Sequence, residues 1–233
     1  MTVNFLLISG LVLSHSILFV GNSYTASNGG IAPQVKQIYD SIEPDTLIVS
    51  DHAVGGATFE NHWNNQSLLD NIESGQWETV VFQEQSTMPV INPEKTYIYG
   101  DSLAEFSATH GAAPVFFMTW ARKNDPLMLE GLNLAYSRMG FANDALVTPA
   151  GFAFDFVRKY HPEINPYSSD GTHPSLEGTY LAACVFNVII YDTDILSSGV
   201  WEPAGILPDQ AEILRTIAVE VCEEYNQPSA EEN

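Results

Sequence analysis

Basic side chains are scarce in this chain of 233 residues. Eight Lys and Arg residues stand against 29 Asp and Glu residues, which gives a formal net charge of -21 at pH 7. A field of this sign repels nucleic acid and anionic membrane surfaces, so neither is expected as a partner, and polyanionic substrates are disfavoured. We interpret the charge as serving solubility or adaptation to a salty medium, and it does not select a reaction.

Cysteine is rarer still, with only Cys184 and Cys222 in the chain. Neither residue belongs to a CxxC pair or to a Cys/His cluster with metal-ligand spacing, so we expect no metal site and no cofactor. The two thiols leave open one disulfide or two buried small hydrophobic residues. No apolar run approaches the ~20 residues of a membrane-spanning helix, so no membrane span is expected.

Repeats, low-complexity tracts and charged linkers are also lacking, which predicts a single domain over residues 17–226 followed by a polar tail at residues 227–233. Residues 1–16 have the apolar core and the small-x-small ending of a signal peptide. No Lys or Arg precedes that core, and cleavage after Ser16 would leave the first predicted strand at the new terminus. We favour export, periplasmic or secreted, over a retained cytoplasmic extension.

Apolar segments of two kinds alternate along the chain. Five are short, which predicts strands at residues 17–20, 46–50, 77–82, 113–120 and 145–149. Longer segments predict helices at residues 31–42, 93–110, 127–140, 151–160, 175–191 and from residue 208 onward, with one or two short helices within residues 59–74. This alternation predicts a parallel sheet covered by helices on both faces.

Ser23 follows the first predicted strand, just after a tight turn marked by Gly21. Open α/β sheets usually build their sites at the carboxyl ends of the strands, where this serine lies. A hydroxyl alone is a poor nucleophile and needs a base and an orienting acid, which Asp170 and His173 can supply. At this spacing the carboxylate can turn back onto the imidazole and fix its tautomer, which leaves Nε2 free to take the serine proton.

Two stretches of the chain resemble a known family. The run Gly21-Asn22-Ser23-Tyr24-Thr25 resembles the first block of the SGNH hydrolases, the GDSL esterase/lipase superfamily, in the variant with Asn in place of the usual Asp. The pattern Asp170-x-x-His173-Pro174 resembles their last block, and two weaker blocks lie between in the family's order. The resemblance implies a flavodoxin-like three-layer α/β/α sandwich with a five-stranded parallel sheet, and hydrolysis of esters.

The two weaker blocks imply an oxyanion hole. The turn at Gly56 resembles the second block, in which a glycine backbone N–H contributes to the hole. The third block normally carries an Asn, whereas this chain has glutamines, whose amide is one methylene longer. Alignment with the block favours Gln85 as the donor, with Gln83 as the alternative. The implied hole therefore consists of the Ser23 and Gly56 backbone N–H groups and the Gln85 amide.

Together these features predict a serine esterase for short-acyl esters, acetyl esters first, with a carbohydrate as a candidate acyl acceptor. No long apolar lid segment is apparent, and the negative charge suits neutral small-molecule substrates. We retain two alternatives on the same fold, a non-catalytic carbohydrate-binding module and an acyltransferase that uses the same triad. A flavin or nucleotide protein is disfavoured because Gly29-Gly30 is too slight a phosphate-binding signal. The sequence does not indicate an oligomeric state.

Overall fold

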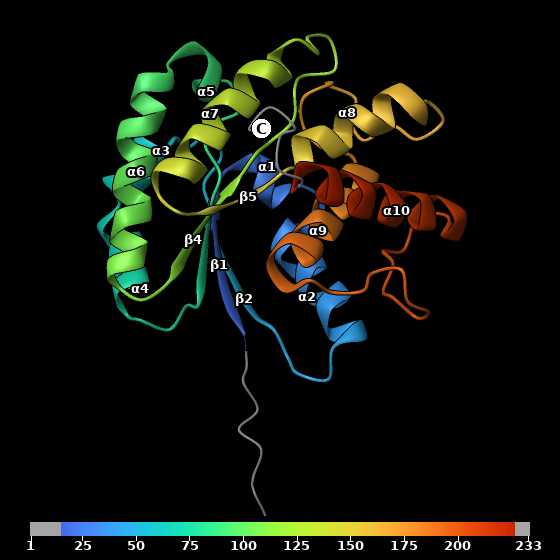
Figure 1. Cartoon of the computed structure of the whole chain (residues 1–233), viewed down its shortest axis with the longest axis horizontal. Helices are drawn as coiled ribbons and strands as arrows, with labels where there is room; N and C mark the ends of the chain where they lie inside the picture. The colour runs from blue at the N-terminus through green and yellow to red at the C-terminus, as the bar shows by residue number, and fades with distance from the viewer. Residues whose placement is uncertain (1–14, 227–233) are drawn as a thin grey trace, which may run out of the picture.

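Five parallel strands form the centre of the molecule, which we describe from a computed structural model over residues 15–226 (Figure 1). The strands, in chain order, are Ser16–Gly21 (β1), Ile48–Ala53 (β2), Thr79–Phe82 (β3), Ala113–Phe117 (β4) and Leu146–Thr148 (β5). They lie in the order β2-β1-β3-β4-β5, and every neighbouring pair is parallel. The predicted five-stranded parallel sheet is confirmed, in the flavodoxin-like order that the family resemblance implied.

Helices occupy most of the remaining chain. The longer ones are Ile31–Ile42 (α2), Gln66–Glu73 (α4), Pro93–Thr109 (α6), Met128–Ala142 (α7), Ala150–Tyr160 (α8), Leu176–Tyr191 (α9) and Pro208–Tyr225 (α10). The shorter ones are Ser23–Ala26 (α1), Phe59–Trp63 (α3) and Met88–Ile91 (α5), with a 3-10 turn at Ser27–Gly29 (η1). Within the described part of the chain, no helix has both the length and the apolar character needed to span a bilayer.

Alternate residues of the central strands β1, β3 and β4 face two separate apolar cores, because successive side chains of a strand point to opposite faces of the sheet. In β1, Ile17 and Phe19 belong to the core shared with α2, α8, α9 and α10, whereas Leu18 and Val20 belong to the core shared with α3, α4, α6 and α7. Figure 1 shows these two groups of helices on opposite sides of the sheet. The molecule is therefore the expected three-layer α/β/α sandwich.

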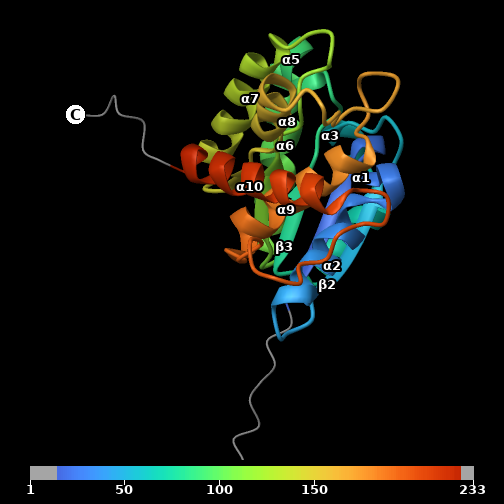
Figure 2. The same cartoon turned by 90° about the vertical axis from the view of Figure 1, so that its right-hand side faces the viewer.

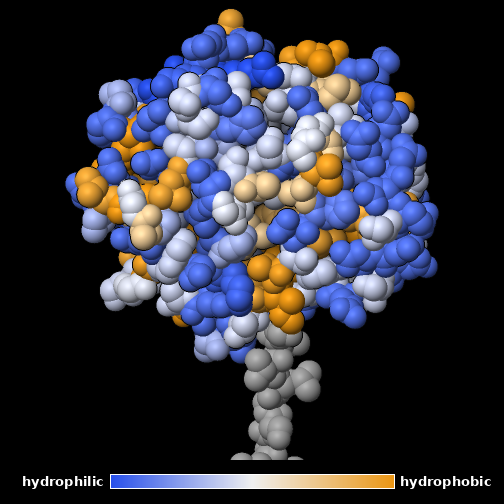
Figure 3. Space-filling model, turned by 180° about the vertical axis from the view of Figure 1, so that it is seen from behind, coloured by the Kyte–Doolittle hydropathy of each residue, from blue (hydrophilic) through white to orange (hydrophobic). Residues whose placement is uncertain are grey.

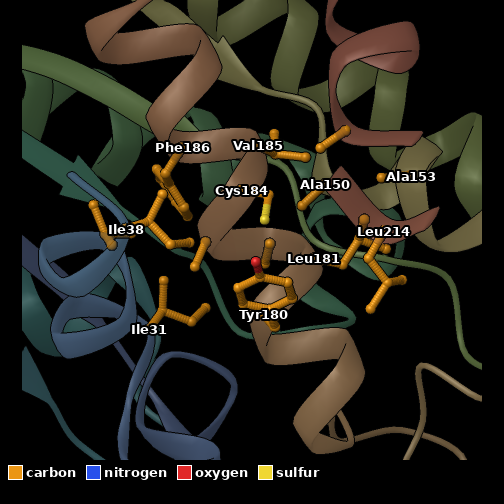
Figure 4. Packing of buried hydrophobic residues seen from close by; sticks show 14 of the residues in the cluster. Ile31, Ile38, Ala150, Ala153, Tyr180, Leu181, Cys184, Val185, Phe186 and Leu214 are labelled. Carbon is orange, nitrogen blue, oxygen red and sulfur yellow. The ribbon is translucent and has the colours of Figure 1, made fainter. Parts of the chain in front are cut away.

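Helix α9 is buried throughout residues 178–187, as its nearly uniform apolar sequence predicts. It lies between α2 and α10, with α10 crossing in front of it in Figure 2. Figure 4 shows Tyr180 and Phe186 of α9 among Ile31 and Ile38 of α2, with Leu214 of α10 on the other side. The buried helix gives a rigid support to the loop that precedes it.

Both cysteines lie in this core as free thiols, Cys184 on α9 and Cys222 on α10. Burial raises the pKa of each thiol to about 12. Of the two options that the sequence left open, the structure shows buried small hydrophobic residues.

Several predicted boundaries differ from the structure. Strand β2 continues three residues past the predicted end at residue 50, because it is an edge strand, in which the exposed Asp51 and the half-buried His52 can pair with β1. Helices α1 and α5 were not predicted, since four residues are too few to show a helical period. Residues 1–14, which hold most of the expected signal peptide, and the polar tail at 227–233 lie outside the described residues.

Polar side chains dominate one face of the molecule. Figure 3 shows a face that is largely hydrophilic, with smaller apolar patches between the polar regions. This surface agrees with the chain's large negative charge.

Candidate active site

The imidazole of His173 lies between the two other residues of the expected triad. Its Nε2 atom is 2.9 Å from the Oγ atom of Ser23, and its Nδ1 atom is 2.6 Å from Oδ2 of Asp170. Ser23 is the first residue of α1, directly after β1, and the other two residues lie on the loop before α9. The fold thus brings together three residues that are up to 150 positions apart in the sequence.

Three further donors hold the carboxylate of Asp170. Its Oδ1 atom accepts hydrogen bonds from the Ser168 hydroxyl at 2.7 Å and from the backbone N–H groups of Thr172 at 2.8 Å and His173 at 2.9 Å. The bond from the His173 ring, followed by that from the Thr172 N–H, holds the pKa of Asp170 well below its usual range. Asp170 is therefore ionised across the physiological range and can keep a proton on Nδ1 of the imidazole.

The loop that carries Asp170 and His173 is hydrogen-bonded to the segment that follows β4. The indole N–H of Trp120 donates to the carbonyl of Thr172 at 2.9 Å, and the backbone N–H of Lys123 donates to the carbonyl of Gly171 at the same distance. The segment at residues 121–126 thus lies against the triad loop. Gly171 has φ of +69°, a conformation in which a side chain would be strained.

An aromatic stack supports the imidazole from the side of the protein core. The ring of Tyr24 meets the His173 ring edge-on at 5.3 Å between centroids. Tyr24 stacks on Trp120 at 4.9 Å, and Trp120 stacks on Phe154 at 3.9 Å, with interplanar angles of 6° and 3°. These three rings are buried, so they limit the movement of the base.

Asn28 links the serine segment directly to the His173 loop. Its side-chain amide donates to the carbonyl of Pro174 at 3.0 Å, to the carbonyl of Ser175 at 2.8 Å and to the Thr179 hydroxyl at 2.8 Å. Ser175 in turn caps α9 by accepting from the Gly178 N–H. These contacts fix the distance between nucleophile and base.

The turn before Ser23 requires the glycine at position 21. A Cβ atom at Gly21 would collide with Oγ1 of Thr25 and lie 2.8 Å from Oε1 of Gln83. The carbonyl of Gly21 accepts hydrogen bonds from the Val54 N–H at 3.0 Å and from Nε2 of His62 at 3.0 Å. His62 is buried, and burial lowers its pKa to about 4.

Asn22 joins three segments of the site with one side chain. Its Oδ1 atom accepts from the Tyr24 N–H at 3.1 Å and caps α1. Its Nδ2 atom donates to the carbonyl of Ala57 at 3.0 Å and lies 3.4 Å from the carbonyl of Glu84. The residue before the nucleophile thereby connects the serine turn to the two loops that carry the expected oxyanion donors.

Gly56 lies at the surface in a turn closed by a 2.9 Å hydrogen bond from the Ala57 N–H to the Val54 carbonyl. Its φ is +71°, which explains the glycine, and the space around its α-carbon is open. Among the described residues, neither the Gly56 N–H nor the Ser23 N–H donates to a protein acceptor. Both N–H groups are therefore without a partner in this part of the chain.

The two candidate glutamines have different surroundings. Gln83 is fully buried, and its Oε1 atom accepts from the Asn22 N–H and the Thr25 hydroxyl, both at 3.0 Å, while its Nε2 atom donates to the Glu84 carbonyl. Both polar atoms of its amide are thus bonded within the protein, and its oxygen supports the serine turn. The sequence did not indicate this supporting role of Gln83.

Gln85 is half-buried, and its Oε1 atom accepts from the Thr87 N–H, the Thr87 hydroxyl and the Met88 N–H at 2.8, 2.9 and 3.2 Å. Its Nε2 atom has only a distant contact of 3.5 Å with the Ser86 hydroxyl, so an N–H of this amide remains available. The oxygen shapes the loop, and the nitrogen is the group that could face an oxyanion.

Solved structures share this fold. A candidate SGNH hydrolase from Slackia heliotrinireducens is 26% identical, with a TM-score of 0.66 over 76% of this chain and 99% of its own. A DUF4886 family protein from Bacteroides uniformis is 15% identical, with a TM-score of 0.73 over 93% and 97% of the two chains. An acetylxylan esterase from Geobacillus stearothermophilus is 14% identical, with a TM-score of 0.65 over 77% and 96%. No protein-family model and no curated protein matches the sequence.

The fold is that of the SGNH hydrolases, as the comparison with the protein from Slackia heliotrinireducens shows, and this confirms the resemblance seen in the first and last sequence blocks.

Proposed function

We propose that this chain hydrolyses short-acyl esters through Ser23 as nucleophile, His173 as general base and Asp170 as the orienting acid. The observation that carries the proposal is the position of the His173 ring, within hydrogen-bond distance of Ser23 on one side and of Asp170 on the other. A serine that is hydrogen-bonded to a base, with that base oriented by a third group, is the arrangement that activates a hydroxyl.

The reaction follows from this geometry. Ser23 Oγ attacks the ester carbonyl as its proton moves to Nε2 of His173, and the ester C–O bond then breaks as the leaving alkoxide takes that proton. Water attacks the acyl-serine in the same way, and the carboxylic acid leaves as the proton returns to Ser23. Asp170 stays ionised throughout and stabilises the imidazolium that forms in each step.

The oxyanion that forms in both steps would be bound by the backbone N–H groups of Ser23 and Gly56 and by the side-chain amide of Gln85. The two backbone donors have no protein acceptor among the described residues, and the Gln85 nitrogen has one long contact. Each donor of this kind typically lowers the barrier by about 3 kcal/mol.

For the substrate we favour an acetyl ester of a soluble alcohol, with a sugar as the first acceptor to test. Side chains of the triad are open to water, with His173 38% exposed and Asp170 48% exposed. Long acyl chains need apolar surface around the nucleophile that removes them from water, and an open site offers less of it. One structural neighbour is an acetylxylan esterase, which motivates the choice of acetylated sugars.

The test is a series of p-nitrophenyl esters from acetyl to dodecanoyl, followed by a panel of acetylated sugars. We expect kcat/KM to be highest for acetyl and to fall with chain length, and we expect activity to survive a chelator. A steady rise of kcat/KM toward long chains would contradict the short-acyl assignment. Loss of activity with the chelator would contradict the metal-independent mechanism.

Product analysis separates hydrolysis from the two alternatives on the same fold. With a sugar or glycerol present as a competing acceptor, a hydrolase releases mainly acetate, whereas an acyltransferase forms mainly the new ester. A non-catalytic binding module would release neither product and would not react with a serine-directed phosphonate.

A further inference from the structure

Glu84 is a buried acid that the proposed mechanism does not use. It follows β3 by two residues and is 1% exposed. The charge of Lys95 acts on it, but the Lys95 ammonium pairs with Glu60 at 2.5 Å. A carboxyl group without an ion pair is costly to bury, so its position here needs a reason in the contacts that it makes.

The carboxyl group of Glu84 connects two loops of the site. Its Oε1 atom accepts from the backbone N–H of Phe59 at 2.9 Å and from the backbone N–H of Gln85 at 2.6 Å. Phe59 is the first residue of α3 and follows the Gly56 turn by three residues. The other carboxyl oxygen of Glu84, Oε2, lies 3.5 Å from the Thr96 hydroxyl on α6, which limits the rotation of the carboxyl group.

The backbone of Glu84 is held as firmly as its side chain. The N–H donates to the Tyr136 hydroxyl on α7 at 3.3 Å. The carbonyl accepts from the side-chain amide of Gln83 and lies 3.4 Å from Nδ2 of Asn22. Glu84 thus contacts a residue at or near each of the three proposed oxyanion donors. These residues lie in the serine turn, in the segment that follows Gly56, and in the loop of Gln85.

We propose that Glu84 is a positioning residue of the oxyanion hole, whose carboxyl oxygen holds the segment after Gly56 and the loop of Gln85 at a fixed distance from each other. This inference rests on the proposed esterase function. Donors of an oxyanion hole act only when they are held where the charge develops, and a displacement of 1 Å at such a site can lower the rate about 100-fold. An acceptor shared between the two loops prevents that displacement.

The experiment compares Glu84→Gln with Glu84→Met in the full chain. The amide oxygen of the glutamine can still accept from the Phe59 and Gln85 N–H groups, whereas methionine has a similar length and no comparable acceptor. We expect kcat of Glu84→Met to fall about 100-fold with KM changed less than about threefold, because the lost interaction matters in the transition state. We expect Glu84→Gln to stay within about fivefold of wild type.

Leu103→Ala is the matched control for the effect of a disturbed core. Leu103 is fully buried on α6, in the apolar core that also contains Phe59. Its apolar side chain forms no hydrogen bond with the oxyanion loops. Its substitution should lower the melting temperature and leave kcat near wild type when both are assayed well below that temperature. A fall in kcat for Glu84→Met that Leu103→Ala reproduces at equal stability would contradict a specific role.

Two further outcomes decide the inference. Unchanged kcat in folded Glu84→Met would overturn it, and so would a Glu84→Gln variant as impaired as Glu84→Met, because the charge and not the acceptor would then matter. If wild type hydrolyses no ester, the proposed function fails by itself. Amide exchange then still tests the positioning role, because the Phe59 and Gln85 amides should exchange faster in Glu84→Met and remain protected in Glu84→Gln.

Discussion

The side-chain amide of Asn22 donates to the carbonyl of Ala57 at a distance of 3.0 Å. This contact joins the residue before the nucleophile to the residue after the proposed oxyanion glycine. The same nitrogen lies 3.4 Å from the carbonyl of Glu84, so two buried acceptors surround it. The chain therefore needs a donor at position 22, where the family resemblance would lead one to expect an acceptor-only Asp.

We predict that Asn22→Asp impairs the protein although Asp is the usual family residue. The new carboxylate oxygen would face the carbonyls of Ala57 and Glu84 without a proton to share. Leaving these buried groups unpaired should lower the free energy of unfolding by about 1–3 kcal/mol, measured by urea denaturation. The kcat for an acetyl ester should fall at least about tenfold, because the loop at Ala57 would separate from the serine turn.

Asn64→Asp is the matched control for this prediction. Asn64 also donates its amide to a backbone carbonyl, that of Glu60 at 2.8 Å, but it does so at the surface. Water can replace that bond, so both stability and kcat should remain near wild type. Wild-type stability and kcat in Asn22→Asp would contradict the requirement for a donor.

Gln85→Ala should lower kcat by about 100-fold and leave KM nearly unchanged, because the amide interaction matures only when charge develops on the oxygen. Gln83→Ala should instead act mainly on stability, since its side chain supports the Asn22 N–H and the Thr25 hydroxyl. Steady-state kinetics and thermal unfolding of both variants separate the two roles. If Gln83→Ala is folded and carries the kcat effect while Gln85→Ala does not, the assignment of the donor is wrong.

Two buried titratable groups should oppose each other in the pH dependence of stability. Burial raises the pKa of Glu84 from 4.5 to about 7, despite hydrogen bonds from Gln85 and Phe59 and the more distant charge of Lys95. Between these two pH values the folded state binds a proton on Glu84 that the unfolded state has released. The stability that this protonation contributes is therefore lost as the pH rises from 4.5 through 7. Burial, with the neighbouring His52, lowers the pKa of His62 from 6.5 to about 4, so its contribution is lost as the pH falls from 6.5 through 4.

Each shift corresponds to about 3 kcal/mol, so the two effects should nearly cancel between pH 4.5 and 6.5. We predict that the free energy of unfolding of wild type, relative to Glu84→Gln, falls by about 3 kcal/mol between pH 4.5 and 7. Relative to His62→Gln it should rise by a similar amount between pH 4 and 6.5. Parallel pH profiles for all three proteins, measured by denaturant unfolding, would show that neither group titrates with a shifted pKa.

The sequence was sufficient to predict the class of fold, because each central strand is an uninterrupted apolar run and each long helix has an amphipathic or wholly apolar pattern. It also placed Ser23 at the carboxyl end of a strand, and the resemblance of the Ser23 and Asp170-x-x-His173 blocks to the SGNH hydrolases implied that the three residues would meet. Strand β2 was predicted imperfectly because an edge strand does not need an apolar pattern.

The supporting residues of the site could not be predicted in the same way. Glu84 looks like an ordinary loop residue in the sequence, and Gln83 was indicated only as the alternative oxyanion donor. The structure shows that both are buried, with Glu84 bonded to residues of α3, α6 and α7. Asn22 belongs to the first sequence block, but the short helix that it caps was not predicted. Its contact with Ala57 depends on the position of another loop, which no local pattern encodes.

The most direct test of the account is kcat/KM for an acetyl ester in folded Ser23→Ala compared with wild type. The triad predicts a loss of at least about 10⁴-fold, because the only activated nucleophile is removed while the structure is kept. Circular dichroism and the melting temperature should confirm that the variant is folded. Turnover within about tenfold of wild type in that folded variant would contradict the assignment of Ser23 as the nucleophile.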